Sequence, residues 1–454
     1  MSSPAEMEAF LGRLYRQNEF AIKLGLEAIT SALKLLARPD RGRARLLVAG
    51  TNGKGTVTAF LSSIAHTAGL RTGTFSSPHL CHFRERIRVD GRWVDDDELL
   101  RVGTAALDRF GGRAGRDDAP AALTLTFFEL ATLMAVVVFD SAQTQLDVFE
   151  VGLGGRLDAT NALSAELCVI TPISRDHTQW LGETDDEIAF EKAGIIREGT
   201  PVVVHSSRGL EVIRRVAHDR KAPCVVLGED FEITGNRFRG LGRDLLLPGL
   251  EGQPTHHACN VATAVAAGLV AMEHGVIPTL DDWALTRALA RCTWPGRWWR
   301  LPAQTTRAIP ESVEVLLDAA HNPAGARAVV DALRASGQAS QPLALVINAA
   351  KDKDVRGITE ALDELHFERI FVAPVSSSRI HDPQEFVAHS VWTPDRVETS
   401  AELLSAFDGA LDAVSRGGMV LVMGSIYLLG ELIVALGCDD ALQSIFSGGD
   451  VDEV

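Results

Sequence analysis

The chain has 454 residues, too many for one ordinary hydrophobic core, so two or three domains are expected. Its 60 acidic residues outnumber its 44 basic residues, and the net charge of −16 argues against a surface that binds nucleic acid or an anionic membrane. The six cysteines form no C-x-x-C pair, so the sequence indicates neither a disulfide framework nor a zinc site.

The N-terminal residues 1–20 are polar and contain no apolar signal region. The longest apolar run, Leu130–Phe139, is too short to span a bilayer, so we expect a cytoplasmic protein without membrane contact. Residues 7–38 are predicted to be helical, with apolar side chains supplying one buried face.

Residues 46–68 predict a strand, a glycine-rich turn and a helix. The apolar run Leu46–Ala49 is the strand, Thr56–Ala68 has helical spacing, and between them lies Gly50-Thr51-Asn52-Gly53-Lys54-Gly55-Thr56. Backbone N–H groups in such a turn, together with a helix N-terminus, favour a bound phosphate. Lys54 is expected to reach the outer phosphates and Thr56 to offer its hydroxyl to Mg²⁺. The alternative, a tight turn with a surface lysine, is disfavoured by the flanking strand and helix, although Gly55 is one glycine more than the common G-x-x-x-x-G-K-[ST] motif has.

Further strands and helices alternate downstream, which predicts a parallel sheet covered on both faces. The predicted strands are 70–75, 147–151, 167–171 and 201–205, and the predicted helices are 95–110, 126–140, 187–195 and 257–272. Ligands bind at the carboxyl ends of such strands, so the loops that follow at Gly50, Ser77, Gly152 and Asp176 should converge on one site.

Trp294–Arg297 interrupts this pattern, and a second alternation begins near residue 313. Its predicted strands are 314–317, 343–348, 369–373 and 419–423, with helices at 324–336, 355–365 and 400–415. We therefore predict an α/β protein with two domains, residues 1–297 and 298–454, and a frayed acidic tail over 446–454.

Several polar residues stand at strand or helix ends, and each has two interpretations. Glu150 ends an apolar strand and either holds Mg²⁺ opposite the phosphate loop or pairs with Arg156. His177 is a second metal ligand or a hydrogen-bonded loop residue. Lys192, at an apolar helix end, either snorkels to the surface or is chemically special, and composition does not decide between these.

The second domain repeats the arrangement of strand, polar turn and helix at Asp318–Pro323. Asp318 is a candidate to accept a hydrogen bond from a ribose hydroxyl and His321 to face phosphates, whereas the alternative is helix capping by Asp318 or Asn322. The run Lys351–Asp354 is open to interpretation as a solvated charge run with a helix cap.

These motifs together resemble the folylpolyglutamate synthase/dihydrofolate synthase family of the Mur ligase superfamily. The resemblance runs in family order from about residue 20 to residue 430 and rests on the phosphate loop, Ser76–Leu80, Glu85–Ile87, Glu150–Asn161, Asp176-His177, Glu191–Ile195, Pro295–Arg297, Asp318–Pro323, Asp352–Asp354 and Gly424-Ser425, with a further match at Ile22–Leu26. It implies a P-loop-type parallel-sheet ATPase domain followed by a smaller Rossmann-like α/β domain.

The resemblance also implies roles for individual residues. Lys54, Lys192, His177 and Arg297 would be catalytic, with Lys54 binding ATP phosphates. Thr56 and Glu150 would hold one Mg²⁺, His177 would help to hold a second, and Lys192 would be carbamylated to become a metal ligand. The nucleotide would also contact Asn260, Arg297, Asp318 and His321. The folate-type substrate would lie near Ser77, Pro78, His79, Glu85, Arg86, Arg156 and Asp158.

The reaction implied by the resemblance is ATP-dependent amide formation. L-Glutamate would be added through an acyl phosphate to dihydropteroate, to the glutamate tail of a reduced folate, or to both, by a monomer that binds neither nucleic acid nor membrane. Three alternatives stay open at this point: a monofunctional folylpolyglutamate synthase, another Mur-type ligase, and a regulatory ATPase that is not a ligase. The last has no use for Ser77–Leu80 or Lys192.

Overall fold

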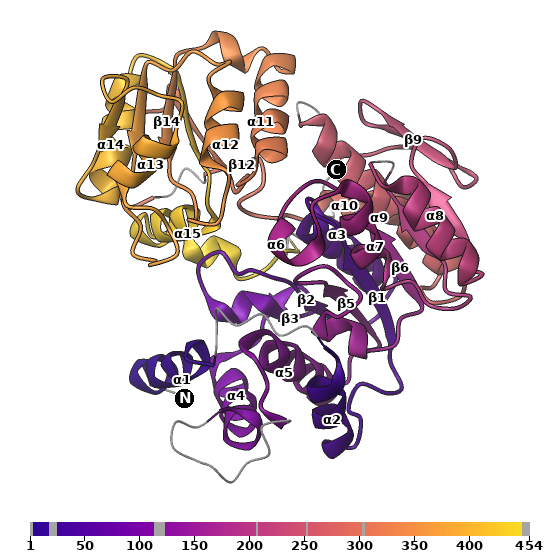
Figure 1. The fold of residues 1–454 in the computed structure, drawn as a ribbon. Coiled ribbons are helices and arrows are strands. Elements are labelled where there is room, and N and C mark those ends of the chain that lie inside the picture. The colour runs from indigo at the N-terminus through magenta and orange to yellow at the C-terminus, as the bar shows by residue number, and fades with distance from the viewer. Residues whose placement is uncertain are drawn as a thin grey trace.

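The computed structural model describes residues 3–17, 25–112, 123–205, 208–250, 253–301 and 305–446 (Figure 1). The family match at Ile22–Leu26 therefore lies largely outside the described residues, as do most of the predicted tail and part of the predicted helix 7–38. Within the described ranges, no helix is both long and apolar enough to cross a membrane.

The N-terminal domain is built on one eight-stranded sheet in the order β4-β3-β2-β5-β1-β6-β7-β8. The strands are β1 (Ala44–Ala49), β2 (Thr72–Phe75), β3 (Ile87–Val89), β4 (Arg92–Trp93), β5 (Leu146–Glu150), β6 (Leu167–Ile170), β7 (Val202–Val204) and β8 (Cys224–Val226). From β2 to β8 all neighbours are parallel, whereas β3 and β4 form an antiparallel edge. In this register Val48 is paired with Glu150, which places the end of β5 beside the turn that follows β1.

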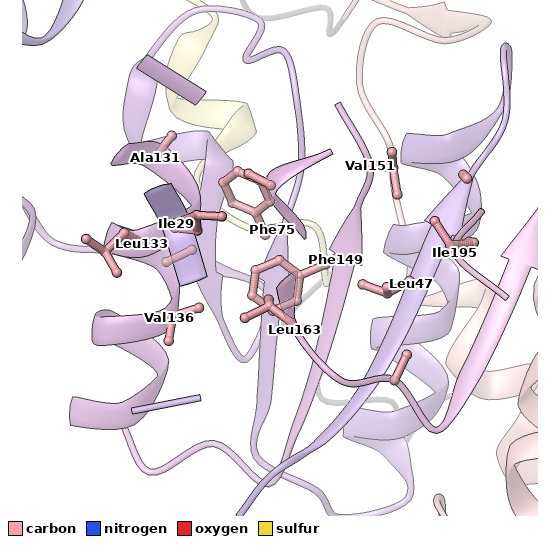
Figure 2. Close-up of a cluster of buried hydrophobic side chains, with 14 of the residues drawn as sticks. Ile29, Leu47, Phe75, Ala131, Leu133, Val136, Phe149, Val151, Leu163 and Ile195 are labelled. Atoms are coloured by element: carbon pink, nitrogen blue, oxygen red, sulfur yellow. The ribbon is translucent and has the colours of Figure 1, made fainter. Parts of the chain in front are cut away.

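Side chains of β1 alternate between two cores, as the period of a strand requires. Leu47 packs on the side shown in Figure 2, with Phe75 and Phe149 of neighbouring strands. The helices on that side are α1 (Pro4–Tyr15), α2 (Glu27–Leu35), α4 (Asp96–Phe110), α5 (Phe127–Ser141), α7 (Asp185–Ala193) and α8 (Leu210–Asp219).

Leu46 and Val48 point to the opposite face of the sheet. That face is covered by α3 (Lys54–Thr67), α9 (Thr255–Glu273) and α10 (Asp282–Ala290). A small antiparallel sheet of β9 (Phe231–Thr234), β10 (Arg237–Gly240) and β11 (Arg243–Leu246) packs into the same core.

The C-terminal domain holds a six-stranded sheet in the order β12-β13-β17-β14-β15-β16. Its strands are β12 (Trp299–Arg300), β13 (Val313–Asp318), β14 (Leu343–Ile347), β15 (Arg369–Val372), β16 (Val397–Thr399) and β17 (Gly418–Met423), and β12 alone is antiparallel to its neighbour. One face is covered by α11 (Pro323–Ala335), α12 (Val355–Leu362) and α13 (Pro383–His389), the other by α14 (Leu403–Ala413) and α15 (Ile426–Ala435). The predicted α/β class, with a large parallel-sheet domain and a smaller second one, is confirmed.

The charged segment after β2 forms regular structure inside the fold. Residues Phe83–Arg86 form a short 3-10 helix, η1, and Ile87–Val89 join the sheet as β3. Glu85, Arg86 and Arg88 are buried although they are charged, because each finds partners inside the fold. These partners inside the fold offset the cost of burying the three charges.

The chain returns to the N-terminal domain at its end. We call residues 439–446, which begin with the 3-10 helix η5 (Asp439–Leu442), the C-terminal strap. Ile445 donates its N–H to the carbonyl oxygen of Gly91 at 3.0 Å and accepts from the N–H of Thr293 at 2.9 Å. Phe446, which is 7% exposed, stacks on His66. Phe446, the first residue of the tail predicted to be frayed, is therefore packed and not frayed. The division into two domains at residue 297 remains a proposal, and the strap crosses back from the second domain to the first.

Candidate functional site

A cavity of about 380 Å³ lies between the carboxyl ends of the two sheets. Gly50, Ser77, Gly152 and Asp176 all line it, so the predicted convergence of the loops after β1, β2, β5 and β6 is confirmed. The C-terminal domain closes the cavity with residues from three loops and from the start of α15, namely His321, Ala350, Asp352, Lys353, Arg379, Gly424, Ser425, Ile426 and Tyr427.

The phosphate loop owes its shape to glycines in tight contact with their surroundings. Gly50 and Gly53 have φ values of 145° and 84°, in the region that favours glycine. A Cβ atom on Gly53 would lie 2.4 Å from the side-chain oxygen of Asn260, and one on Gly55 would lie 2.8 Å from Nε1 of Trp294. The additional Gly55 therefore gives the indole ring of Trp294 room against the first turn of α3.

Two lysines meet at one carbonyl oxygen of this loop. Lys54 Nζ donates to the carbonyl oxygens of Gly50 and Thr51, each at 3.1 Å, and Lys192 Nζ donates to that of Gly50 at 2.8 Å. Burial lowers the pKa of both, that of Lys192 to about 7. Because Lys192 is only 4% exposed, the interpretation as a snorkelling surface lysine is wrong.

Glu150 faces the same space from the end of β5. Its Oε2 accepts the N–H of Ser77 at 3.1 Å, and burial raises its pKa, an effect that the charge of Lys54 partly offsets. The alternative pairing with Arg156 is wrong, because Arg156 pairs with Glu191 at 2.8 Å.

Thr56 and Glu150 both line the cavity and offer the hard oxygen donors that Mg²⁺ prefers. Across the described ranges, no three side chains of His, Cys, Asp and Glu form a cluster that could hold a metal ion. A metal ion at Thr56 and Glu150 would therefore complete its coordination with water or ligand oxygens, which fits the way Mg²⁺ binds at phosphate sites.

The loop after β6 places two titratable groups at the cavity. His177 has a φ of 51° and lies at the N-terminus of α6 (Thr178–Leu181), and burial lowers its pKa to about 4, so the ring is neutral at pH 7. Lys353 Nζ donates to Asp176 Oδ1 at 2.8 Å, and His321 Nε2 lies 3.6 Å from Oδ2. Burial alone would raise the pKa of Asp176, but the bond from His321 and the charge of Lys353 hold it well below its ordinary value.

Of the residues predicted to lie near the folate-type substrate, Ser77, Pro78, Arg86 and Asp158 line the cavity. Arg86 Nε donates to His79 Nδ1 at 2.8 Å, and burial lowers the pKa of His79 well below its ordinary value, which keeps the ring neutral and able to accept. The guanidinium group of Arg86 also lies over the ring of Phe127. His79 therefore stands behind Arg86 and does not line the cavity.

Two of the residues predicted to lie near the substrate, Glu85 and Asp158, hold loops in place. Glu85 accepts the N–H groups of Leu80, Cys81 and His82 at 2.9, 2.7 and 2.6 Å. Asp158 lines the cavity but also accepts the N–H groups of Gly152 and Leu153 at 3.1 and 2.9 Å. Arg156, paired with Glu191, lies outside the cavity lining.

Of the other residues predicted to contact a nucleotide, Arg297 and His321 line the cavity, whereas Asn260 and Asp318 do not. Asn260 is buried behind Gly53, and its Oδ1 atom has no hydrogen-bond partner in the structure. The carboxylate of Asp318 accepts the N–H groups of Trp298 and Ala320, each at 2.8 Å, and so fixes the segment that links the domains.

Several cavity residues escaped the sequence analysis. Phe127 and Phe128 begin α5, Tyr427 lies in the first turn of α15, and Arg379 Nη1 donates to the hydroxyl group of Tyr427 at 2.9 Å. For Phe127 and Phe128, a usable sequence signal was the capping box that begins at Thr126, because it marks the start of α5. For Lys353, the interpretation as part of a solvated charge run is wrong, because its side chain is 10% exposed.

Comparison with known proteins gives consistent matches. Residues 303–426 match the family described as Mur ligase, glutamate ligase domain. A dihydrofolate synthase/folylpolyglutamate synthase of Bacillus subtilis is 30% identical over 431 residues, which cover 91% of this chain and 95% of the relative. One from Mycobacterium tuberculosis is 33% identical over 468 residues, which cover 93% of this chain and 92% of the relative.

Solved structures agree with these matches. Escherichia coli FolC in complex with DHPP and ADP superposes with a TM-score of 0.81 and 29% identity, covering 98% of this chain and 99% of that one. A bifunctional folylpolyglutamate synthase/dihydrofolate synthase with Mn, AMPPNP and L-glutamate bound gives a TM-score of 0.78 and 29% identity, covering 96% of this chain and 98% of that one.

Proposed function

Because this chain belongs to the dihydrofolate synthase/folylpolyglutamate synthase family of Mur ligases, we propose that its cleft joins L-glutamate to dihydropteroate, to the tail of a reduced folate, or to both. The chain is an ATP-dependent ligase, and the open question is which carboxylate it activates. The observation that carries the proposal is the single cavity that the phosphate loop, Arg86 and the start of α15 all line.

The reaction proceeds in two balanced steps. A carboxylate oxygen of the folate-type substrate attacks the γ-phosphorus of ATP, so that the bond to the bridging oxygen breaks and ADP leaves. The amine of L-glutamate then attacks the carbonyl carbon of the acyl phosphate, loses a proton and expels inorganic phosphate. Both steps gather negative charge at the phosphate loop, and catalysis rests on neutralising that charge and on aligning the reactants.

Different residues of the cavity neutralise the charge and align the reactants. Lys54 replaces its bonds to the Gly50 and Thr51 carbonyls with bonds to the outer phosphates of ATP, which relieves a buried charge. Arg86, held by His79, directs its guanidinium group toward the carboxylate to be activated. Arg297 faces the cleft from the interdomain segment and adds positive charge.

We further propose that Thr56 and Glu150 hold one Mg²⁺, and that His177 and a carbamylated Lys192 help to hold a second. When bound, these ions would neutralise phosphate charge and orient its oxygens. The neutral ring of His177 and the low pKa of Lys192 support this assignment, because a metal needs an unprotonated imidazole and CO2 adds to an unprotonated amine. We also propose Asn260 and Asp318 as nucleotide contacts, which would form only if the two domains closed further on the cavity. Monomeric state and cytoplasmic location also stay predictions.

The deciding experiment is ADP release measured with ATP, Mg²⁺ and L-glutamate in the presence of either dihydropteroate or tetrahydrofolate. A bifunctional enzyme releases ADP with both acceptors, and a monofunctional one releases it with a single acceptor. Reactions without glutamate are the control for uncoupled hydrolysis. ADP release that ignores both glutamate and acceptor would favour the regulatory ATPase, and release with glutamate but neither acceptor would indicate another carboxylate.

A further inference from the structure

Polar contacts join the domains directly at the cleft, among them the approach of His321 Nε2 to Asp176 Oδ2 at 3.6 Å. Lys353 Nζ donates to Asp176 Oδ1 at 2.8 Å, and Asn322 Nδ2 donates to Asn52 Oδ1 at 3.2 Å. In each pair one residue belongs to the phosphate-loop side and the other to the C-terminal domain. Within the cavity lining, the ion pair therefore ties one wall to the other.

This ion pair differs from an ordinary surface pair. The side chains of Lys353 and Asp176 are 10% and 11% exposed, whereas a solvated pair is screened and contributes little. Removing one partner would leave a poorly solvated charge, which is strongly unfavourable. The orientation of the two domains that keeps this pair together is therefore favoured over one that separates it.

Asp176 is coupled mechanically to the phosphate loop. Thr51 donates its N–H to the carbonyl oxygen of Pro172 at 2.9 Å and its hydroxyl to that of Ser174 at 3.0 Å. Asn52 Nδ2 donates to the hydroxyl oxygen of Ser174 at 3.3 Å. These three hydrogen bonds therefore tie Pro172 and Ser174 to the phosphate loop, and we expect a displacement of Asp176, two residues further on, to reach the phosphate site.

Hydrogen bonds within the C-terminal domain hold the loop that carries Lys353. Its N–H donates to the carbonyl oxygen of Ala350 at 3.0 Å, and Asp354 caps α12 by accepting the N–H of Gly357 at 2.9 Å. In the same loop, the N–H of Lys351 donates to the carbonyl oxygen of Arg379, whose side chain lines the cavity. Lys353 is therefore fixed relative to the side of the cavity that the C-terminal domain forms.

We propose that Lys353 is a positioning residue whose ion pair with Asp176 docks the C-terminal domain onto the phosphate-loop side, so that Arg379 and the start of α15 face the phosphate site. Docking is a property of the fold, and only its benefit to the reaction rests on the proposed ligase function. Because Lys353 acts through Asp176, its loss should lower kcat and weaken use of glutamate more than it weakens the binding of ADP to the phosphate loop.

The test compares Lys353→Met with Lys351→Met, a matched control on the exposed lysine two residues earlier in the same loop. Hydrogen exchange of peptides covering 172–181 is measured without nucleotide, alongside kcat, KM for glutamate and the Kd for ADP. We expect Lys353→Met to speed exchange in this segment and lower kcat by about 10²-fold. The Kd for ADP should stay within about threefold, because its phosphates lie on the N-terminal domain. Lys351→Met should resemble the wild type.

Lys353→Arg, which keeps the charge, should restore most of the protection and activity, and it serves as the second variant if Lys353→Met does not fold. Slow ligation with unchanged exchange over 172–181 would overturn docking and make Lys353 a direct substrate contact. Unchanged activity with faster exchange would overturn the role of Lys353 as a positioning residue, since docking would then not matter for the reaction. A wild-type chain without ligase activity would refute the proposed function. The hydrogen exchange of residues 172–181 in the two variants would still test the docking contact.

Discussion

Lys192 donates a hydrogen bond of 2.8 Å to the carbonyl oxygen of Gly50, the first residue of the phosphate loop. Its pKa of about 7 means that most of the amine is neutral at pH 8, and a neutral amine adds CO2 to give a carbamate and a released proton. Wild-type protein in ¹³C-bicarbonate at pH 8 should therefore show a carbamate carbon by NMR. Lys192→Ala should lack that carbon and most of the activity, with weak rescue by short carboxylates. An unmodified Lys192 that tolerates alanine would rule out the metal-ligand role.

The same lysine predicts a pH dependence of stability in CO2-free buffer. The pKa falls from 10.5 in the unfolded chain to about 7 in the folded one, so the unfolded chain binds more protons between these values. This group therefore opposes folding most strongly below pH 7, and the penalty fades as pH rises toward 10. Lys192→Met should gain stability relative to the wild type at pH 6, and in chemical denaturation that advantage should shrink steadily as pH rises from 7 toward 10. A difference that does not vary with pH would contradict the perturbed pKa.

Lys54→Ala should abolish ligation without unfolding the chain. Burial lowers the pKa of Lys54, so its charge is unfavourable in the folded state before phosphate binds, and the Gly50 carbonyl keeps its bond from Lys192. We expect kcat to fall by about 10²-fold to 10³-fold, as for loss of a group that stabilises developing charge. Lys34→Ala, on an exposed face of α2, is the control. Normal activity in a stable Lys54→Ala protein would remove the phosphate role.

Gly55→Ala tests the additional glycine of the loop. Alanine would gain up to about 1 kcal/mol in helix propensity. Its Cβ, however, would lie 2.8 Å from Nε1 of Trp294, and overpacking costs roughly 1–3 kcal/mol. We expect the overlap to win, with lower stability in urea and lower kcat because Trp294 lies three residues before Arg297. The double variant Gly55→Ala with Trp294→Leu should recover stability relative to Gly55→Ala. No recovery would show that the loss has another origin.

Phe446→Ala tests the C-terminal strap. The ring is buried against His66, and loss of a buried phenylalanine costs roughly 3–5 kcal/mol. Thermal unfolding should report this loss in the N-terminal domain, although residue 446 follows the whole C-terminal domain in sequence. Leu246→Ala, at a side chain that is 63% exposed, should change stability by no more than about 0.5 kcal/mol. Equal effects of the two substitutions would mean that the strap does not stabilise the first domain.

The fold was largely predictable, because its signals are local. The strand before Gly50 and the helix after it follow from apolar periodicity and from glycines at turn positions, and β13, β14, β15 and β17 follow from short apolar runs. The helix α15 was missed because it is apolar on nearly all sides and is buried between the domains, so it shows no amphipathic period.

The convergence of the loops followed from the parallel sheet, but individual site residues were most predictable where one loop carries both the shape and the chemistry of the site. Gly50–Thr56 and Glu150 meet that condition. Lys353 does not, because its burial depends on Asp176, which lies 177 residues earlier on the other domain. Arg379 and Tyr427 likewise reach the cavity through the packing of the C-terminal sheet. No sequence pattern near either residue indicates that it lines a cavity.

The strap also constrains the order in which the molecule can be completed during synthesis. The N-terminal sheet and its helices emerge from the ribosome first, yet Ile445 and Phe446, which cover part of their core, are translated only after the strands of the C-terminal sheet. Until then, the surface around Gly91, His66 and Thr293 stays uncovered while the second domain folds. The first domain therefore completes its core only when the strap has been translated, and the chain crosses between its domains twice.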